Sequence, residues 1–212
     1  MRILYAAFVT FGLASGTASA ATLADVKTGF TAVRTIIIDG KKYVGRMVAM
    51  PGKERHEQQI QGFEPIFLLR NDKPIGEAVL AKLHTIVQFS IPPEFRMLAS
   101  KELKKSPAGQ EAVNGIATTK YAIDENVPEG HASGNLWLSA DGIPMRLAGT
   151  FASKNGKVST LRWELSQVKI GPQPDALFEA PAGYAKLPPE AIAPLLGRGS
   201  NRPRIRGFLS SR

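Results

Sequence analysis

The sequence predicts a mainly β protein: an antiparallel meander that forms an open half-barrel, with one principal helix packed on the concave face. Turn dipeptides such as Asp39-Gly40, Pro51-Gly52 and Asn155-Gly156 separate short strand-like runs, a pattern typical of antiparallel sheets and barrels. Only one stretch has helical periodicity. Strands and helices do not alternate, which argues against a doubly wound nucleotide-binding fold.

Residues 1–20 have the composition of a signal peptide. Arg2 precedes an apolar run, and Ala18-Ser19-Ala20 supplies the small residues of a cleavage site. We therefore expect export to the periplasm and cleavage after Ala20. An uncleaved anchor is the alternative, although the apolar run is shorter than the roughly 20 residues of a spanning helix.

A half-barrel domain is expected over residues 21–190. Before the helix, alternating or continuous apolar runs between turn signals predict strands. These runs are 30–38, 42–50, 53–60, 64–70, 76–80 and 83–89.

The principal helix is expected from Pro92 to Lys105. Phe95, Leu98 and Leu103 recur on one stripe at helical spacing, which is typical of an amphipathic helix that packs on a sheet. Ser106-Pro107 and Gly109 are expected to end it.

Strands resume at 114–124, at a hairpin over 136–150 and at 158–170. In the hairpin, Asp141-Gly142 predicts a two-residue type I′ turn. Counting outward, the turn pairs Ala140 with Ile143, Leu138 with Met145 and Leu136 with Leu147 on one apolar face. Trp137 faces Arg146 on the other face. After 171, one helical turn is expected within residues 172–184.

Catalytic and metal-binding patterns are missing from the sequence, so we expect no catalytic residues, no metal and no cofactor. There is no cysteine, which excludes disulfides and thiolate ligands. The three histidines do not have metal-ligand spacing. His56, between Arg55 and Glu57, is expected on a solvated strand face.

The apolar strand faces are therefore the candidate functional surface. They are either an ordinary core or a binding face for a hydrophobic ligand, and the residues alone do not decide between these. The candidate ligand-binding residues are Leu136, Leu138, Met145, Leu147, Leu161, Trp163 and Leu165 of the strands, and Phe95 and Leu98 of the helix.

The formal net charge is +9, and much of it lies in residues 191–212. This tail is rich in Gly, Ser, Pro and Arg, a composition that cannot build a core and predicts disorder. It is either a solvated terminus or a segment that contacts anionic membrane surfaces. Nucleic acid is not an expected partner for an exported chain. The five arginines of this tail are Arg198, Arg202, Arg204, Arg206 and Arg212.

Several motifs resemble the LolA/LolB-like superfamily of periplasmic lipoprotein carriers. They are "YVGRMVAMPGKERHEQ", "IFLLRNDKPI", "GNLWLSADGIPMRLAGT" and the closing "PDALFEAPAGY". The resemblance implies a half-barrel whose helices plug the concave face, with acyl chains between sheet and helix, and neither catalysis nor a cofactor. It also implies that Arg55 lies near the lid.

The sequence thus predicts a periplasmic, non-enzymatic protein that binds an acyl chain or other hydrophobic ligand, as a carrier or chaperone. The expected partner is a lipid or an acylated protein. The alternative is an envelope protein-interaction or sensing module on the same fold, in which the protein's own side chains fill the groove.

Overall fold

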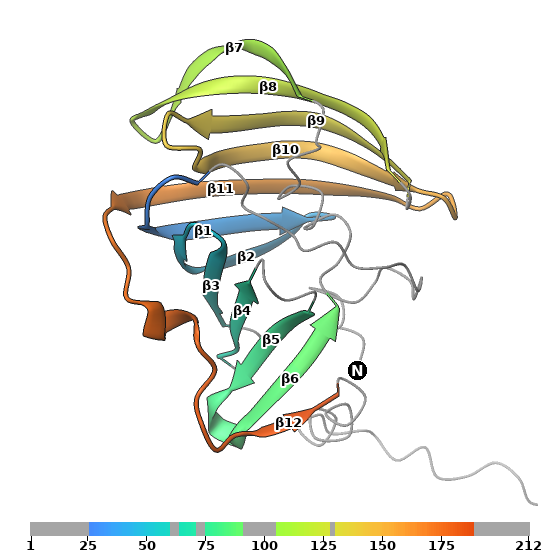
Figure 1. Cartoon of the computed structure of the whole chain (residues 1–212). Coiled ribbons are helices and arrows are strands. Elements are labelled where there is room, and N and C mark those ends of the chain that lie inside the picture. Colours follow the sequence, from blue (N-terminus) through green and yellow to red (C-terminus); the bar gives the residue numbers. More distant parts are fainter. Residues whose placement is uncertain (1–25, 60–63, 71–74, 91–104, 128–129, 189–212) are drawn as a thin grey trace, which may run out of the picture.

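The computed structural model describes residues 26–59, 64–70, 75–90, 105–127 and 130–188. The leader, the tail 191–212, and Phe95 and Leu98 lie outside these ranges. The described part forms one twelve-stranded sheet and two short 3₁₀ turns (Figure 1). Its elements are β1 (Phe30–Ile38), β2 (Lys41–Met50), β3 (Lys53–Gln58), β4 (Ile66–Arg70), β5 (Ile75–Leu80), η1 (Ala81–Leu83), β6 (Thr85–Ser90), β7 (Lys105–Val113), β8 (Ile116–Val127), β9 (Gly130–Ser139), β10 (Pro144–Ser153), β11 (Val158–Ile170), η2 (Asp175–Phe178) and β12 (Ala185–Leu187).

The sheet is built from two antiparallel meanders joined in the middle. Its order is β12-β6-β5-β4-β3-β2-β1-β11-β10-β9-β8-β7, so β1 pairs with β11 and joins the two halves. β12 adds to β6 in parallel. The edges β7 and β12 lie at opposite ends of the molecule (Figure 1). The predicted open, mainly antiparallel sheet is therefore confirmed.

Two hairpins use the two-residue turn that needs positive φ at both positions. Asp39 and Gly40 have φ of 48° and 79°, and Asn114 and Gly115 have φ of 49° and 81°. Asp39-Gly40 was predicted as a turn from its residue types, and Ile38 pairs with Lys41 across it. Local chemistry alone sets this register.

The predicted two-residue turn at Asp141-Gly142 is wrong, because the loop has three residues. The Gly142 amide donates to the Ser139 carbonyl, and the Ser139 amide donates to the Ile143 carbonyl, both at 3.0 Å. The loop is thus Ala140 to Gly142. The Ser139 hydroxyl also accepts the amides of Asp141 and Ile143, at 3.2 and 3.1 Å. This loop needs positive φ only at Gly142 (74°), which spares Asp141 the strain of the two-residue turn.

A bulge follows this loop and moves the predicted pairs. Leu138 faces Pro144, and Met145 is the extra residue. The predicted pairing of Leu138 with Met145 is therefore wrong. The register recovers at Arg146, which faces Trp137, and the predicted pairing of Leu136 with Leu147 is confirmed.

The principal helix is not supported by the described structure. Residues 91–104 lie outside the described ranges, and Lys105 begins strand β7. Ser106-Pro107 and Gly109 were expected to end the helix, but they lie in β7 at a bulge, with φ of 131° at Gly109. Proline and glycine fit edge strands and bulges, so here they do not mark the end of a helix. Within the described residues, no helix is both long enough and apolar enough to cross a membrane.

Side chains alternate between the two faces of the sheet. We call the face that carries Ile36, Met47 and Leu165 the inner face, and the opposite one the outer face. Two apolar clusters contain most of the large inner-face side chains, and the larger cluster also includes Trp137 of the outer face. The larger one contains Ile36, Met47 and Leu165 together with residues of β9 and β10. The smaller one spans β4 to β6 around Phe67 and Ala78.

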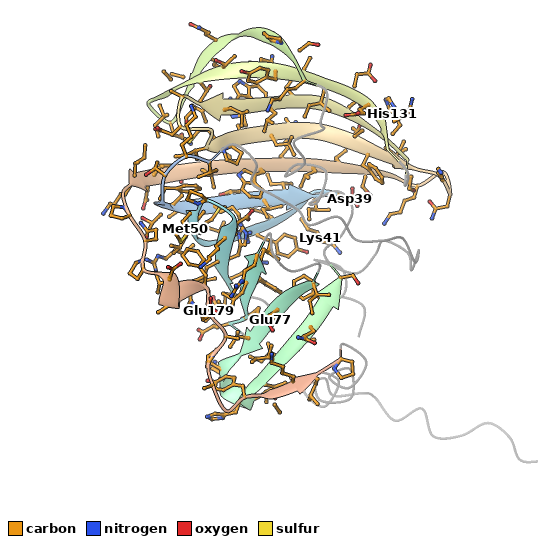
Figure 2. All side chains as sticks on the ribbon, in the orientation of Figure 1. Asp39, Lys41, Met50, Glu77, His131 and Glu179 are labelled. Carbon is orange, nitrogen blue, oxygen red and sulfur yellow. The ribbon has the colours of Figure 1, made fainter. Side chains whose placement is uncertain are left out.

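The C-terminal segment 171–188, here called the strap, packs on the outer face of β3 to β6. Ala180 and Tyr184 contact a buried cluster of Leu68, Val79 and Ile86. Ion pairs fasten the strap to the strands, with Lys53 Nζ 2.5 Å from Asp175 and Arg70 Nη1 2.6 Å from Glu179. Figure 2 shows Glu179 on the strap beside these strands. The predicted helical turn is η2, but it lies on the outer face and cannot fill the inner one.

Candidate functional site

The register aligns large apolar side chains of the inner face in a row across five strands. Leu136 faces Leu147, and Leu147 faces Trp163. Trp163 faces Ile36, which faces Tyr43. The row therefore runs from β9 through β10, β11 and β1 to β2, across the centre of the sheet (Figure 1).

Seven of the predicted ligand-binding residues gather in the larger inner cluster. Five are buried, and Leu138 and Leu161 pack against them half-buried. The buried five are Leu136, Met145, Leu147, Trp163 and Leu165. The structure thus brings the strand residues of the prediction together, while Phe95 and Leu98 lie outside the described residues.

Arg55 lies on the other side of the sheet. It pairs with Val48 and Leu68 in the register and points to the outer face. Its Nη1 donates to the carbonyl of Leu177 at 3.0 Å, and its Nε donates to Glu57 at 2.7 Å. In the described structure Arg55 therefore holds the strap. Contact of Arg55 with a lid stays a prediction.

A buried polar group on the inner face was missed by the sequence analysis. Arg34 and His56 are each only 3% exposed, and Gln58 is 6% exposed. The expectation that His56 lies on a solvated face is wrong. Arg34 could have been found from its strand, because Ala32 and Ile36 share its face at the strand period of two. We call Arg34, Glu54, His56 and Gln58 the polar island.

The polar island is a chain of hydrogen bonds between β1 and β3. Arg34 Nη1 bonds His56 Nδ1, and Arg34 Nη2 donates to Gln58 Oε1 at 2.6 Å. His56 Nε2 lies 2.6 Å from Glu54 Oε2. A guanidinium has no acceptor, so His56 Nδ1 must accept and Nε2 carries the proton that is donated to Glu54.

Gly45 of β2 makes this reach possible. It lies between Arg34 and Gln58 in the register, and it has no side chain to block the arginine. A Cβ built at Gly45 would also lie 2.2 Å from the Glu57 carbonyl oxygen. Glycine is therefore required here by close approach of the neighbouring strand.

Burial holds the imidazole neutral. Desolvation lowers the pKa of His56 below its ordinary 6.5, and the charge of Arg34 lowers it further, against the opposing effect of Glu54. Desolvation also lowers the pKa of Arg34, to about 10, so the guanidinium stays charged at neutral pH. The island thus holds one cation, one neutral imidazole and one carboxylate.

Three buried side-chain polar atoms of the described part lack a hydrogen-bond partner. They are Arg34 Nε, Trp163 Nε1 and Ser159 Oγ, and the register places all three residues on the inner face. The guanidinium carbon of Arg34 lies 5.8 Å from the centroid of the Trp163 ring. The His56 and Trp163 rings are nearly perpendicular, with their centroids 6.2 Å apart. Two of the three, Arg34 Nε and Trp163 Nε1, thus lie where the island meets the apolar row.

No cluster of three or more metal-binding side chains occurs among the described residues. His131 pairs with Asp124 at 3.1 Å and lies beside Asn126, but this group is at the exposed end of β8 and β9 (Figure 2). It holds the strand ends together. The arrangement on the inner face can bind apolar groups and hydrogen-bond acceptors.

Comparison with known proteins gives a likeness of fold. No family model matches the chain, and no curated protein matches it. An uncharacterized conserved protein from Thermus thermophilus matches with a TM-score of 0.51 at 15% identity, over 77% of this chain and 92% of that one. A chain of the MucA/MucB complex of Pseudomonas aeruginosa matches with a TM-score of 0.45 at 15% identity, over 75% and 58%. A LolA superfamily protein from Nitrosomonas europaea matches with a TM-score of 0.43 at 12% identity, over 74% and 94%. A LolA superfamily protein is thus among the structural neighbours of the chain, as the resemblance of the sequence motifs predicted.

Proposed function

We propose that this protein is an exported, non-catalytic binding protein that carries an acyl chain or another hydrophobic ligand on its inner face. The observation that carries the proposal is the apolar row from Leu136 to Tyr43 on a sheet that stays open at both edges. Large aliphatic and aromatic side chains over five strands suit a long apolar ligand, since such sites are mostly apolar with few polar groups.

The proposed partner is a lipid or an acylated protein, met in the periplasm after cleavage at Ala20. The basic tail 191–212 would add electrostatic attraction to anionic membrane surfaces, which weakens with salt. Both suggestions come from the sequence, and the fold is compatible with them.

A second function is favoured by the burial of the inner face. Leu165 and Met145 are 0% exposed, as expected if the protein's own side chains fill the groove. In that case the same fold would act as an envelope interaction or sensing module. The two functions differ in whether lipid accompanies the protein.

Native mass spectrometry and lipid extraction of the protein, purified from a periplasm after export by its own leader, test this. We expect bound lipid on the wild type and less on Leu161→Gln, which puts an amide on the half-buried inner face. Val44→Gln is the control, because Val44 lies 48% exposed on the outer face. Lipid-free wild type that also fails to bind the oxygen-free fluorescent probe 1-N-phenylnaphthylamine would leave the interaction module as the function.

A further inference from the structure

Two of the unpaired donors on the inner face lie on neighbouring strands. Arg34 lies on β1 and Trp163 on β11, two positions apart in the paired register. The guanidinium carbon is 5.8 Å from the indole ring, while Arg34 Nε and Trp163 Nε1 are both buried without an acceptor. Buried N–H groups are nearly always paired, and each unpaired one is costly. An acceptor that belongs to a ligand would remove that cost.

The charge of the polar island indicates which acceptor fits. The guanidinium of Arg34 is already balanced by Glu54 through the His56 imidazole. A second carboxylate would leave the buried site with a net negative charge, which is expensive in an apolar surrounding. A neutral oxygen accepts the same two hydrogen bonds without this cost.

The surroundings of the island indicate what the acceptor is attached to. The larger apolar cluster lies on the β11 side of the island, and the smaller one, around Phe67 and Ala78, lies on the β4 side. A polar site between two apolar surfaces can bind a molecule with a long apolar chain and one uncharged hydrogen-bond acceptor, either within the chain or at its end. Ester and amide carbonyls of acylated molecules have this form.

We propose that Arg34 and Trp163 form a subsite that binds the ester or amide carbonyl oxygen of an acyl ligand on the inner face. The subsite discriminates acyl compounds from plain hydrocarbons and, because the island is neutral, from free fatty acids. The inference rests on the proposed binding of hydrophobic ligands.

Displacement of the oxygen-free probe 1-N-phenylnaphthylamine by three compounds of similar length tests the subsite. The compounds are methyl laurate, tridecane and laurate, used with the full-length exported protein at a pH where laurate is ionised. We expect methyl laurate to displace the probe at about tenfold lower concentration than tridecane, as two hydrogen bonds to a buried acceptor would give. Laurate should bind more weakly than its methyl ester.

Trp163→Phe is the informative variant, because it keeps an aromatic ring and removes the indole N–H. We expect the preference for methyl laurate over tridecane to fall to about threefold or less, with tridecane still bound. Trp137→Phe is the matched control. Its indole N–H lies on the outer face and donates to Glu111 Oε2 at 2.9 Å, so its removal should leave the preference unchanged.

The outcomes separate this inference from the proposed function. Equal binding of tridecane and methyl laurate would overturn the carbonyl subsite and leave hydrophobic binding intact, as expected if water alone satisfies both donors. Tighter binding of laurate than of its ester would also overturn it. Failure of the probe and all three compounds to bind would remove the proposed function and the inference together.

Discussion

Replacing Arg34 with methionine tests whether the polar island is a stabilising network. Arg34 supplies the donors for two buried acceptors, His56 Nδ1 and Gln58 Oε1. An acceptor left buried and unpaired costs about 1–3 kcal/mol. Methionine matches the length of the arginine stem and removes the cost of burying a charge. We therefore expect a net loss of about 2–4 kcal/mol in the free energy of unfolding.

Urea unfolding at pH 7.5, followed by far-UV circular dichroism, measures this loss. A loss of about 3 kcal/mol corresponds to a fall of about 6–12 °C in Tm for a domain of this size. Arg162→Met is the matched control, since Arg162 is exposed on β11 and its replacement should change stability by less than about 0.5 kcal/mol.

A triple variant separates the network from simple packing. In Arg34→Met/His56→Leu/Gln58→Leu both orphaned acceptors are gone, so much of the lost stability should return. The reasoning is refuted if Arg34→Met is as stable as the control. It is also refuted if the three substitutions destabilise additively, because residues of one network must show coupling.

Three further perturbations follow from the same structure. Because burial lowers the pKa of His56 below 6.5, its contribution to stability is complete above pH 6.5 and is lost as pH falls toward and through the lowered folded-state pKa. Urea titrations should therefore show a larger loss between pH 7.5 and 5 for wild type than for His56→Asn, and equal losses would contradict this. Phe178→Ala should cost about 3–5 kcal/mol, since this ring of the strap is only 1% exposed; a change below 1 kcal/mol in chemical denaturation would mean that the strap does not contribute to the core. Gly45→Ala should lower Tm by several degrees, because its Cβ would lie 2.2 Å from the Glu57 carbonyl, and an unchanged Tm would show that β2 and β3 separate easily.

Strands with a clear local pattern were predictable from the sequence. The expected strands 30–38 and 158–170 coincide with β1 and β11, because alternation and flanking turn dipeptides are local properties of the chain. The turn at Asp39-Gly40 was found for the same reason. Residues 105–113 were missed, because Pro107 and Gly109 suggest a chain break, while the edge strand accommodates both at a bulge.

The apolar part of the candidate site was also predictable, since it needs only strand alternation and pairing. Leu136 and Leu147 were matched by counting from a turn that proved one residue too short, and the bulge at Met145 restored their register. The error at the turn came from the Ser139 hydroxyl, which competes for the loop amides. The turn preference of the Asp141-Gly142 dipeptide gives no information about hydrogen bonds from the Ser139 side chain.

The polar island could not be predicted by reading strands one at a time. A charge on the apolar face of a strand is stable only when other strands bring its partners. His56 is 22 and Gln58 is 24 residues from Arg34 along the chain, and Gly45 lies between them with no side chain to signal a role. In β1 alone, Arg34 is one charge in an apolar run. In β3 alone, Glu54, His56 and Gln58 are polar residues at every second position, which is the pattern of a strand face exposed to solvent. Only the pairing of β1 with β2 and of β2 with β3 brings the two patterns onto one face. The pairing of β1 with β11 then places Arg34 beside Trp163, with a donor on each left unpaired.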